Sequence, residues 1–305
     1  MEPGRPPAGP APSAIPVPPA RVSVVVITRD RRQQLLETLS HLVALPERPP
    51  IIVVDNGSSD GTPRAVAALH PAVRVVSLPT NVGATARNLG VGASTTPYVA
   101  FADDDSWWAP GALAQASGIL DLHQDVAVVA GRTLVGPQRR EDPLNALLAA
   151  SPLGPARRGP GPEVLGFLAC SAVVRRHAFL AVGGFDDLLF FAGEEELLAL
   201  DLAEAGWRCC YDEKTVAHHH PRGPRDGEVR RARLLRNEVL TAWLRRPAPV
   251  AYRRTRALAV AARRDPVARL ALWELARHHR RARARRRRLS PATEAQAEAV
   301  AGHRP

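Results

Sequence analysis

Three consecutive carboxylates, Asp103, Asp104 and Asp105, follow an apolar segment at residues 99–102. Such a group at the end of a strand costs free energy unless a cation or a hydrogen-bond network compensates its charge. Residues two apart lie on the same side of an extended chain. We therefore expect Asp103 and Asp105 to face one divalent metal ion, while Asp104 points elsewhere or binds a ligand hydroxyl. A solvated acidic turn is the alternative.

Two upstream segments have the same form as the segment before these aspartates. Residues 22–28 and 50–55 are rich in Val and Ile, and the second ends in Asp55. Runs of this kind are typical of parallel strands covered by helices on both faces. Apolar residues at helical spacing over 33–45, and Pro63 at the start of a helix over 64–70, predict the intervening helices.

The predicted fold class is therefore α/β, with an open, mostly parallel sheet flanked by helices. In such sheets ligands bind outside the carboxyl ends of the strands. We expect Thr28, Asp55 and the three aspartates to converge there.

The chain resembles family 2 glycosyltransferases, whose nucleotide-binding domain has the GT-A fold, over about residues 22–220. The resemblance rests on five motifs in the same order: VVVITRD at 24–30, VVDNGSSDGT at 53–62, NVGATARNLG at 81–90, ADDD at 102–105, and GGFD at 183–186 followed by GEE at 193–195. It implies an inverting transfer of a sugar from a nucleotide-diphosphate donor to an acceptor hydroxyl. A sugar nucleotidyltransferase or a dinucleotide oxidoreductase is disfavoured, because residues 28–32 contain no glycine for a phosphate-binding turn.

The resemblance implies a donor site built from the first three motifs. It places Asp55 against the nucleobase, with Thr28 on the same floor, and Arg87 beside the base or the phosphates. It implies that Asn88 supports the helix or loop beside Arg87. The alternatives are an ordinary turn beginning at Asp55 and Asn56, in which Gly57 takes positive φ, and an exposed helix arginine at position 87.

The resemblance also makes the aspartates a metal-binding Asp-X-Asp element for Mn²⁺ or Mg²⁺, bridging the two donor phosphates. Asp105 is the expected direct ligand, and Asp103 or Asp104 lies near the ribose or the sugar. His218 or His219 is expected near the diphosphate or the metal, although a histidine tract in a surface loop is the alternative.

The same resemblance places a general base at Glu195, with Glu194 as the second candidate. The chain departs from the family pattern at Leu197, where a later acidic residue is usual, and at Asp201, where an arginine is usual. An acidic first helical turn that complements the helix dipole is the alternative for these glutamates. The alternative function is a catalytically degenerate member that binds nucleotide-sugar, lipid or RNA.

Further elements follow from local patterns. We expect a strand and then a short helix from residue 166, a helix over 226–246 whose apolar residues pack on the catalytic domain or form an interfacial patch, and a helix over 266–277 capped by Asp265. Trp107 and Trp108 form either a wall for the sugar ring or part of the core.

The domain prediction divides the 305 residues into three parts. Residues 1–20, which hold eight prolines, form a disordered leader; residues 21–225 form the GT-A domain, with a nucleotide half to about 130 and an acceptor half from about 131; residues 226–305 form a helical extension. No secretory signal or membrane span is recognisable, which predicts a cytoplasmic protein. Cys170, Cys209 and Cys210 fit no disulfide framework or zinc site and are expected to be reduced.

The formal net charge is +11, and residues 277–288 contain eight arginines. A basic face there can hold the protein against the anionic inner face of a membrane, where a lipid-linked acceptor would reside. A solvated tail or nonspecific nucleic-acid binding are the alternatives, and no specific nucleic-acid partner is expected. The sequence leaves the acceptor open between a glycan, a lipid-linked sugar and a small molecule.

Overall fold

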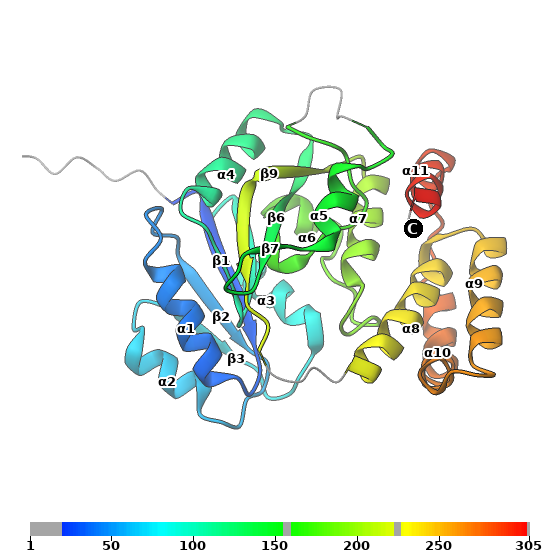
Figure 1. Cartoon of the computed structure of the whole chain (residues 1–305), viewed down its shortest axis with the longest axis horizontal. Helices are drawn as coiled ribbons and strands as arrows, with labels where there is room; N and C mark the ends of the chain where they lie inside the picture. Colours follow the sequence, from blue (N-terminus) through cyan, green and yellow to red (C-terminus); the bar gives the residue numbers. More distant parts are fainter. Residues whose placement is uncertain (1–19, 155–159, 223–226, 304–305) are drawn as a thin grey trace, which may run out of the picture.

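A computed structural model describes residues 20–154, 160–222 and 227–303 of the chain (Figure 1). The expected disordered leader therefore lies outside the described residues, except for Ala20. The described strands are β1 (Val22–Thr28), β2 (Ile51–Asp55), β3 (Arg74–Ser77), β4 (Tyr98–Asp103), β5 (Ser106–Trp108), β6 (Val126–Val135), β7 (Arg140–Glu141), β8 (Ala172–Arg175) and β9 (Arg208–His219).

The described α-helices cover both faces of the sheet and continue beyond its last strand. They are α1 (Arg32–Val43), α2 (Thr62–Leu69), α3 (Ala86–Ala93), α4 (Ala112–Leu122), α5 (Pro143–Ala149), α6 (Arg176–Ala181), α7 (Glu194–Glu204), α8 (Gly227–Arg245), α9 (Ala248–Ala261), α10 (Pro266–Ala284) and α11 (Pro291–His303). None of them is long and apolar enough to cross a membrane.

The strands form one sheet in the order β3-β2-β1-β4-β8-β6-β9-β5, with β7 paired to β6. The neighbours from β3 to β4 are parallel, and so are β6 and β9, whereas β8 runs antiparallel between β4 and β6. The Val and Ile residues of β1 and β2 are buried because helices cover both faces of these strands. The predicted open, mostly parallel α/β sheet with a helical C-terminal extension is confirmed.

Two element predictions need correction. The segment from residue 166 is paired as a strand only at β8, after a short 3₁₀ helix at Ala169–Ser171. Phe167 and Ala169 are nevertheless buried, so their apolar character reflects packing from a loop and not strand pairing. The helix expected over 266–277 extends to Ala284, because the following residues include no glycine or proline. Its predicted cap is confirmed: Asp265 accepts a hydrogen bond of 2.9 Å from the Val267 backbone N–H.

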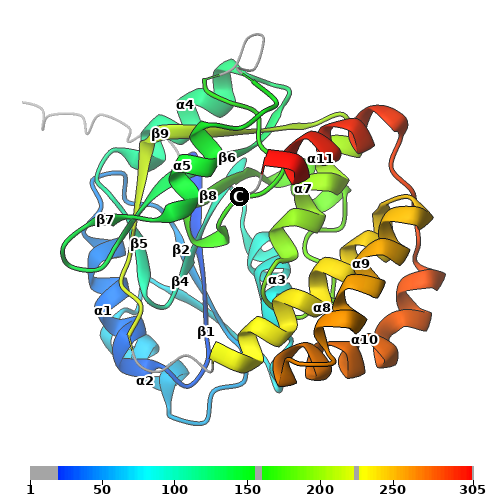
Figure 2. The same cartoon turned by 45° about the vertical axis from the view of Figure 1, so that its right-hand side comes forward.

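The C-terminal helices pack against α7 and the residues just before it. Leu240 and Leu244 of α8 belong to one buried cluster with Leu188, Leu189 and Leu197, the last of these on α7. Figure 2 shows α8 lying between α7 and the pair α9 and α10. Of the interpretations of residues 226–246, packing against the rest of the fold is therefore the one observed. The three cysteines are buried and free, as expected.

Candidate active site

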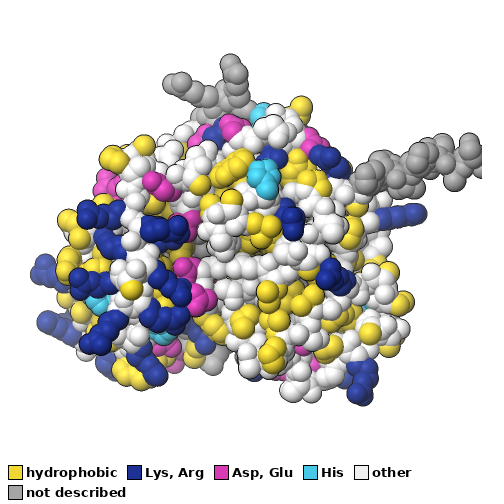
Figure 3. Space-filling model, turned by 180° about the vertical axis from the view of Figure 1, so that it is seen from behind, with side chains coloured by type: hydrophobic (Ala, Val, Ile, Leu, Met, Phe, Trp, Pro, Cys, Tyr) yellow, Lys and Arg dark blue, Asp and Glu magenta, His cyan; other side chains and the backbone are white. Residues whose placement is uncertain are grey.

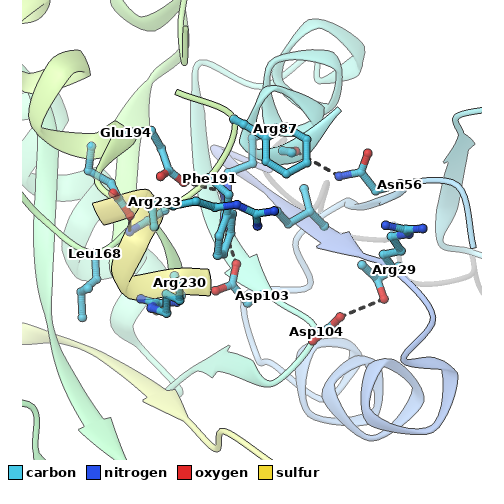
Figure 4. Close-up of a pocket in the computed structure, with 18 of the residues that line it drawn as sticks. Arg29, Asn56, Arg87, Asp103, Asp104, Leu168, Phe191, Glu194, Arg230 and Arg233 are labelled. Carbon is cyan, nitrogen blue, oxygen red and sulfur yellow. Dashed lines mark hydrogen bonds and ion pairs between the residues drawn. The ribbon is translucent and has the colours of Figure 1, made fainter. Parts of the chain in front are cut away.

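A cavity of about 540 Å³ opens at the carboxyl ends of β1 and β4. The start of α3, the loop before α7 and the first turns of α8 complete its walls (Figure 4). Its lining includes Thr28, the three aspartates 103–105, Arg87, Glu194, Glu195 and His219. Most of the residues singled out by sequence therefore share one cavity.

The three aspartates turn in different directions. Arg31 donates hydrogen bonds to both Asp104 (2.7 Å) and Asp105 (3.2 Å), and Thr28 donates one of 3.0 Å to Asp104. Asp103 instead accepts a hydrogen bond from Arg87. Asp103 and Asp105, which were expected to face one metal ion, thus have different partners here: β4 ends at Asp103, so strand alternation does not continue through the turn that follows.

Asp104 is buried under its neighbours. Burial raises the pKa of Asp104 to about 7; the charge of Arg31 opposes this shift, and the charges of Asp105 and Asp103 add to it. The acidic end of the cavity is thus only partly compensated by the cation beside it.

Arg87 lies inside the fold and links two parts of the cavity. The residue is only 1% exposed, so the alternative of an exposed helix arginine is wrong. Besides Asp103, its guanidinium lies 3.6 Å from a carboxylate oxygen of Glu194. Burial opposes the positive charge, but Asp103 and Glu194 outweigh it and raise the pKa of Arg87 above its ordinary value. Neighbouring Asn88 exchanges hydrogen bonds with the Phe185 backbone, which confirms its supporting role.

Glu194 and Glu195 begin α7, directly after Gly193 in the left-handed conformation (φ +83°). Burial and the charge of Glu195 raise the pKa of Glu194 to about 8, although Arg87 opposes the shift. Burial also raises the pKa of Glu195, one of whose oxygens accepts a hydrogen bond of 3.2 Å from the Ala169 N–H. Glu194 is buried and Glu195 is half-buried, so neither behaves as part of a fully solvated acidic first turn.

The loop before these glutamates is held in an unusual conformation. Phe190 and Ala192 have positive φ angles of 60° and 76°. The Ala84 N–H donates to the Phe190 carbonyl at 2.6 Å, and the Asn237 side chain on α8 donates to the carbonyls of Phe191 (3.1 Å) and Ala192 (2.7 Å). Such backbone conformations persist only where the surroundings hold them, and they concentrate at functional sites.

The structure separates the two candidate histidines. His219 lines the cavity, with Nε2 3.4 Å from Asp105 Oδ1. His218 lies beside Trp107, with 5.8 Å between ring centroids, because consecutive residues of β9 face opposite sides of the sheet. Trp107 stacks on His41, and buried Trp108 donates to the Phe101 carbonyl. Neither tryptophan lines the cavity, so both contribute to packing.

Asp55 lies at the end of β2, next to the cavity-lining Asn56. One carboxylate oxygen accepts a hydrogen bond of 3.2 Å from the Ser58 N–H, and Gly57 has φ +77°, as the turn interpretation expects. The other oxygen, Oδ1, is buried without a hydrogen-bond partner among the described residues. Asp55 therefore serves the turn with one oxygen and keeps an acceptor with the other.

Sequence reasoning missed several residues of the cavity. Arg31 follows the first motif and was not expected to hold Asp104 and Asp105. Arg230 and Arg233 of α8 also line the cavity, together with Phe190 and Phe191. The sequence offered one indication of Arg230 and Arg233: they are three residues apart in an amphipathic helix, which places both on one face.

The possible metal ligands are few. Asp105 and His219 offer an oxygen and a nitrogen at neighbouring positions. Within residues 20–154, 160–222 and 227–303, no group of three His, Cys, Asp or Glu side chains converges as a complete metal site.

Comparison with known proteins agrees with this fold. The family model described as "Glycosyl transferase family 2" matches residues 23–183. The N-acetylglucosaminyl-diphospho-decaprenol L-rhamnosyltransferase of Mycobacterium tuberculosis is 29% identical over a 235-residue alignment that covers 65% of this chain and 75% of that protein. The pre-mycofactocin glycosyltransferase of the same organism is 33% identical over 75% of this chain, but the match spans only 47% of that protein.

Solved structures show a related fold at lower identity. A mannosyltransferase from Pyrobaculum calidifontis, in complex with GDP-Man and Mn²⁺, superposes with a TM-score of 0.56 at 22% identity, covering 92% of this chain and 79% of the other. Residues 1–349 of Staphylococcus aureus TarS, in complex with UDP-GlcNAc, give 0.57 at 17% identity, covering 85% and 72%. The expected resemblance is thus confirmed: the chain belongs to glycosyl transferase family 2 and is a glycosyltransferase.

Proposed function

We propose that this enzyme transfers a sugar from a nucleoside-diphosphate donor to an acceptor hydroxyl by a single inverting displacement. The observation that carries the proposal is the arrangement of the cavity, in which buried Glu194, next to half-buried Glu195, lies across Arg87 from Asp103 at the end of β4. A carboxylate whose pKa is raised toward neutrality is a better proton acceptor than an ordinary surface glutamate.

The donor occupies the end of the cavity formed by β1, β2 and β4. Asp55 Oδ1, buried and without a partner among the described residues, is suited to accept the imino proton of a uracil or guanine ring. Thr28 and Asp104 form the floor beside it. Arg87, which already bridges Asp103 and Glu194, holds positive charge next to the donor phosphates.

A divalent cation, Mn²⁺ or Mg²⁺, fits this end of the cavity. Mg²⁺ in enzymes is commonly held by one or two carboxylates plus substrate phosphates, which matches a site offering Asp105 and His219 and no third ligand among the described residues. When bound, the ion would neutralise the diphosphate leaving group. Asp103 and Asp104 then remain available to the ribose or the sugar. The mannosyltransferase and TarS complexes, which hold GDP-Man with Mn²⁺ and UDP-GlcNAc, support a donor of this class.

Glu195 acts as the general base, with Glu194 beside it. The Ala169 N–H holds one oxygen of Glu195, so the other is left to take the proton of the acceptor hydroxyl. The acceptor oxygen forms its bond to the anomeric carbon as the bond from that carbon to the diphosphate breaks. Attack on the face opposite the leaving group inverts the configuration.

The C-terminal helices place this cytoplasmic enzyme against an anionic membrane surface. Tyr252, Leu270 and Trp273 are exposed on α9 and α10, and the Arg277 guanidinium lies 4.5 Å from the Trp273 ring centroid. Aromatic side chains and arginines together suit the boundary between lipid headgroups and acyl chains. The M. tuberculosis rhamnosyltransferase, named for a decaprenol-linked acceptor, supports a lipid-side location.

A thermal-shift experiment tests the donor site. UDP, GDP, CDP and TDP are each added with and without Mn²⁺ to the wild type and to Asp105→Ala. We expect one nucleotide to raise the melting temperature of the wild type in a metal-dependent way, and Asp105→Ala to lose that dependence. If no nucleotide stabilises the wild type, the proposed donor site is wrong.

A second variant tests the base. We expect Glu195→Gln to keep the donor-induced thermal shift and to lose transfer by a factor of about 10² to 10⁴, the usual contribution of general-base catalysis. Donor binding without turnover in the wild type, on any acceptor tried, would instead indicate a catalytically degenerate member.

A further inference from the structure

Two arginines of α8 line the cavity and form no ion pair with a carboxylate in the part of the chain that the structure describes. Arg230 and Arg233 are three residues apart on the same face of the helix, and both line the cavity. No carboxylate of the described residues forms an ion pair with either, in contrast to Arg231 between them, which pairs with Asp265. Two half-buried positive charges thus point into a site that accepts a substrate.

Aromatic rings hold both guanidinium groups in place. The Arg230 guanidinium lies 5.8 Å from the Phe191 ring centroid, and that of Arg233 lies 5.1 Å from the Phe190 ring centroid. The two rings belong to the loop that α8 fixes through Asn237. An arginine stacked on a ring keeps its planar donors free for an oxyanion and loses less conformational freedom when the anion binds.

The pair lies at the end of the cavity that holds the proposed base. In Figure 4, Arg230 and Arg233 lie on the side of Glu194 and Leu168, whereas Asn56 and Arg29 lie at the opposite end, beyond Asp103. The donor's nucleoside is assigned to that opposite end, and its diphosphate to the aspartates. The α8 arginines therefore form a second site for negative charge, on the acceptor side.

We propose that Arg230 and Arg233 bind a phosphate group of the acceptor, so that the acceptor substrate is a phosphorylated compound and not a neutral glycan. This inference rests on the proposed function, because it takes the end near Glu195 as the acceptor end. Two guanidinium groups on adjacent helical turns offer donors enough for a monoester or a diphosphate. The phosphate belongs either to a lipid diphosphate or to a free sugar phosphate, and the probes below distinguish these sources.

Calorimetric titration of the full chain tests the site directly. The donor site is first saturated with the nucleoside diphosphate that gives the largest thermal shift, together with Mn²⁺. Geranyl diphosphate and glucose 1-phosphate are then titrated as separate probes, with geraniol and methyl glucoside as their uncharged counterparts. We expect at least one phosphorylated probe to bind the wild type, and its uncharged counterpart to bind at least about tenfold more weakly.

The variants assign that binding to the arginines. Arg230→Gln/Arg233→Gln is expected to weaken binding of the phosphorylated probe about tenfold or more while leaving the affinity for the nucleoside diphosphate unchanged. Arg230→Lys/Arg233→Lys keeps both positive charges but not the planar guanidinium groups. Its affinity for the phosphorylated probe is expected to lie between those of the wild type and the glutamine variant. The matched control is Arg253→Gln/Arg256→Gln, which removes two exposed charges of α9 outside the cavity and should bind as the wild type does.

The outcomes separate the inference from the proposed function. If the wild type binds no nucleoside diphosphate, the proposed donor site fails first and the inference falls with it. If the nucleotide binds but neither phosphorylated probe does, or if the glutamine variant binds the probe as tightly as the wild type, the inference alone is wrong. Weaker nucleotide binding by the glutamine variant would assign the two arginines to the donor instead.

Discussion

At the scale of single residues, charges in the cavity are paired unevenly: two arginines serve four of its carboxylates, although other arginines also line it. Arg31 serves Asp104 and Asp105, and Arg87 serves Asp103 and Glu194. Isolated ionised carboxylates are costly in such surroundings, so their pKa values rise until part of the charge is removed. The pKa values of Asp104 and Glu194 are thereby raised to about 7 and about 8, in the cavity where the proposed mechanism needs a proton acceptor.

Glu194 is expected to make the stability of the protein depend on pH. Its pKa is about 8 in the folded protein and 4.5 ordinarily, so between these values the folded state keeps a proton that the unfolded chain has lost. Stability must then fall as the pH rises from about 4.5 to 8. Glu194→Gln lacks this loss, so its melting temperature should match the wild type near pH 5 and exceed it at pH 8.5 by at least about 2 °C.

Differential scanning fluorimetry across this pH range measures the effect. Glu298→Gln, which changes an exposed glutamate of α11, is the matched control and should follow the wild type at every pH. A constant difference between Glu194→Gln and the wild type would contradict the raised pKa of Glu194.

Arg31 is expected to compete with a divalent cation. Because its guanidinium already compensates Asp104 and Asp105, Arg31→Gln should tighten Mn²⁺ binding in the absence of donor by about tenfold, equivalent to about 1.4 kcal/mol. Calorimetric titration at pH 8, where Asp104 is mostly ionised, measures this affinity. Arg32→Gln is the control, since Arg32 contacts the Asp60 carbonyl instead; equal affinities in all three proteins would refute the competition.

Residue types could be predicted from the sequence better than residue pairings. Motif matching brought Thr28, Arg87, Glu194 and Glu195 to one cavity, where the structure also places them. The partners of the three aspartates could not be predicted, because they depend on where β4 ends and on the position of Arg31. Nothing in the sequence indicates which carboxylates Arg31 contacts. In the same way, a tract of three histidines does not reveal which one faces the cavity until the register of β9 is known.

At the scale of elements, the loop before α7 decides the position of the proposed base. Its carbonyls are bound by α8 through Arg236 and Asn237, and by the 3₁₀ turn before α3 (Gly83–Thr85) through the Ala84 N–H. The contact with α3 is close: a Cβ atom at Gly83, where φ is +68°, would lie 2.1 Å from the Phe190 carbonyl oxygen. The geometry of α3 and that of α7 are therefore coupled through a single glycine.

Gly83→Ala should break this coupling. We expect a loss of about 2–4 kcal/mol of stability, from the left-handed backbone and the clash together, and a loss of transfer activity because the loop moves Glu195. Chemical denaturation and initial rates measure the two effects.

Gly92→Ala, in α3 just after the 3₁₀ turn that contains Gly83, is the control for the substitution itself. Nothing lies within 4 Å of a Cβ at that position, so the change should be neutral or stabilise by about 0.5–1 kcal/mol. If Gly83→Ala proves as harmless as Gly92→Ala, the close approach of Phe190 is not important for the fold.

Helices and strands could be located from the sequence where the apolar pattern extends over many residues. They could not be located where apolar residues are buried but belong to a loop. The Val and Ile runs of β1 and β2, and the capped start of α10, carry local signals for both type and boundary. The segment around Phe167 has the same apolar character, but it is buried without strand pairing. Only tertiary contacts distinguish these cases.

At the scale of the whole molecule, positive charge is unevenly distributed. Figure 3 shows Lys and Arg side chains gathered over the side that carries the C-terminal helices. Some of the arginines of residues 277–288 bind back to the fold, as Arg281 and Arg285 do with Asp187 and Arg286 does with the Trp243 carbonyl. Part of the predicted basic tail thus forms contacts within the fold, and only its remaining arginines are free of these contacts.

The exposed face of α10 is expected to bind anionic vesicles. Co-sedimentation should show binding to vesicles containing phosphatidylglycerol and little binding to pure phosphatidylcholine, with a loss at high salt. Arg277→Gln should weaken this binding about fivefold, the value of one interfacial charge, and Trp273→Ala should weaken it as well. Leu122→Ala, which removes an exposed apolar side chain of α4, should have no effect; equal binding to both kinds of vesicle would argue against the electrostatic face.

The hydrogen bonds from Asn237 to the loop before α7 limit which segments of this chain can be exchanged with those of a relative. Helix α8 forms one wall of the cavity, so the C-terminal helices cannot be replaced independently of the rest of the fold. A chimera that joins this catalytic half to the last helices of a relative would need a matching side chain at position 237 and a matching loop at 190–192. Recombination within the family is therefore expected to succeed only when both are carried across together.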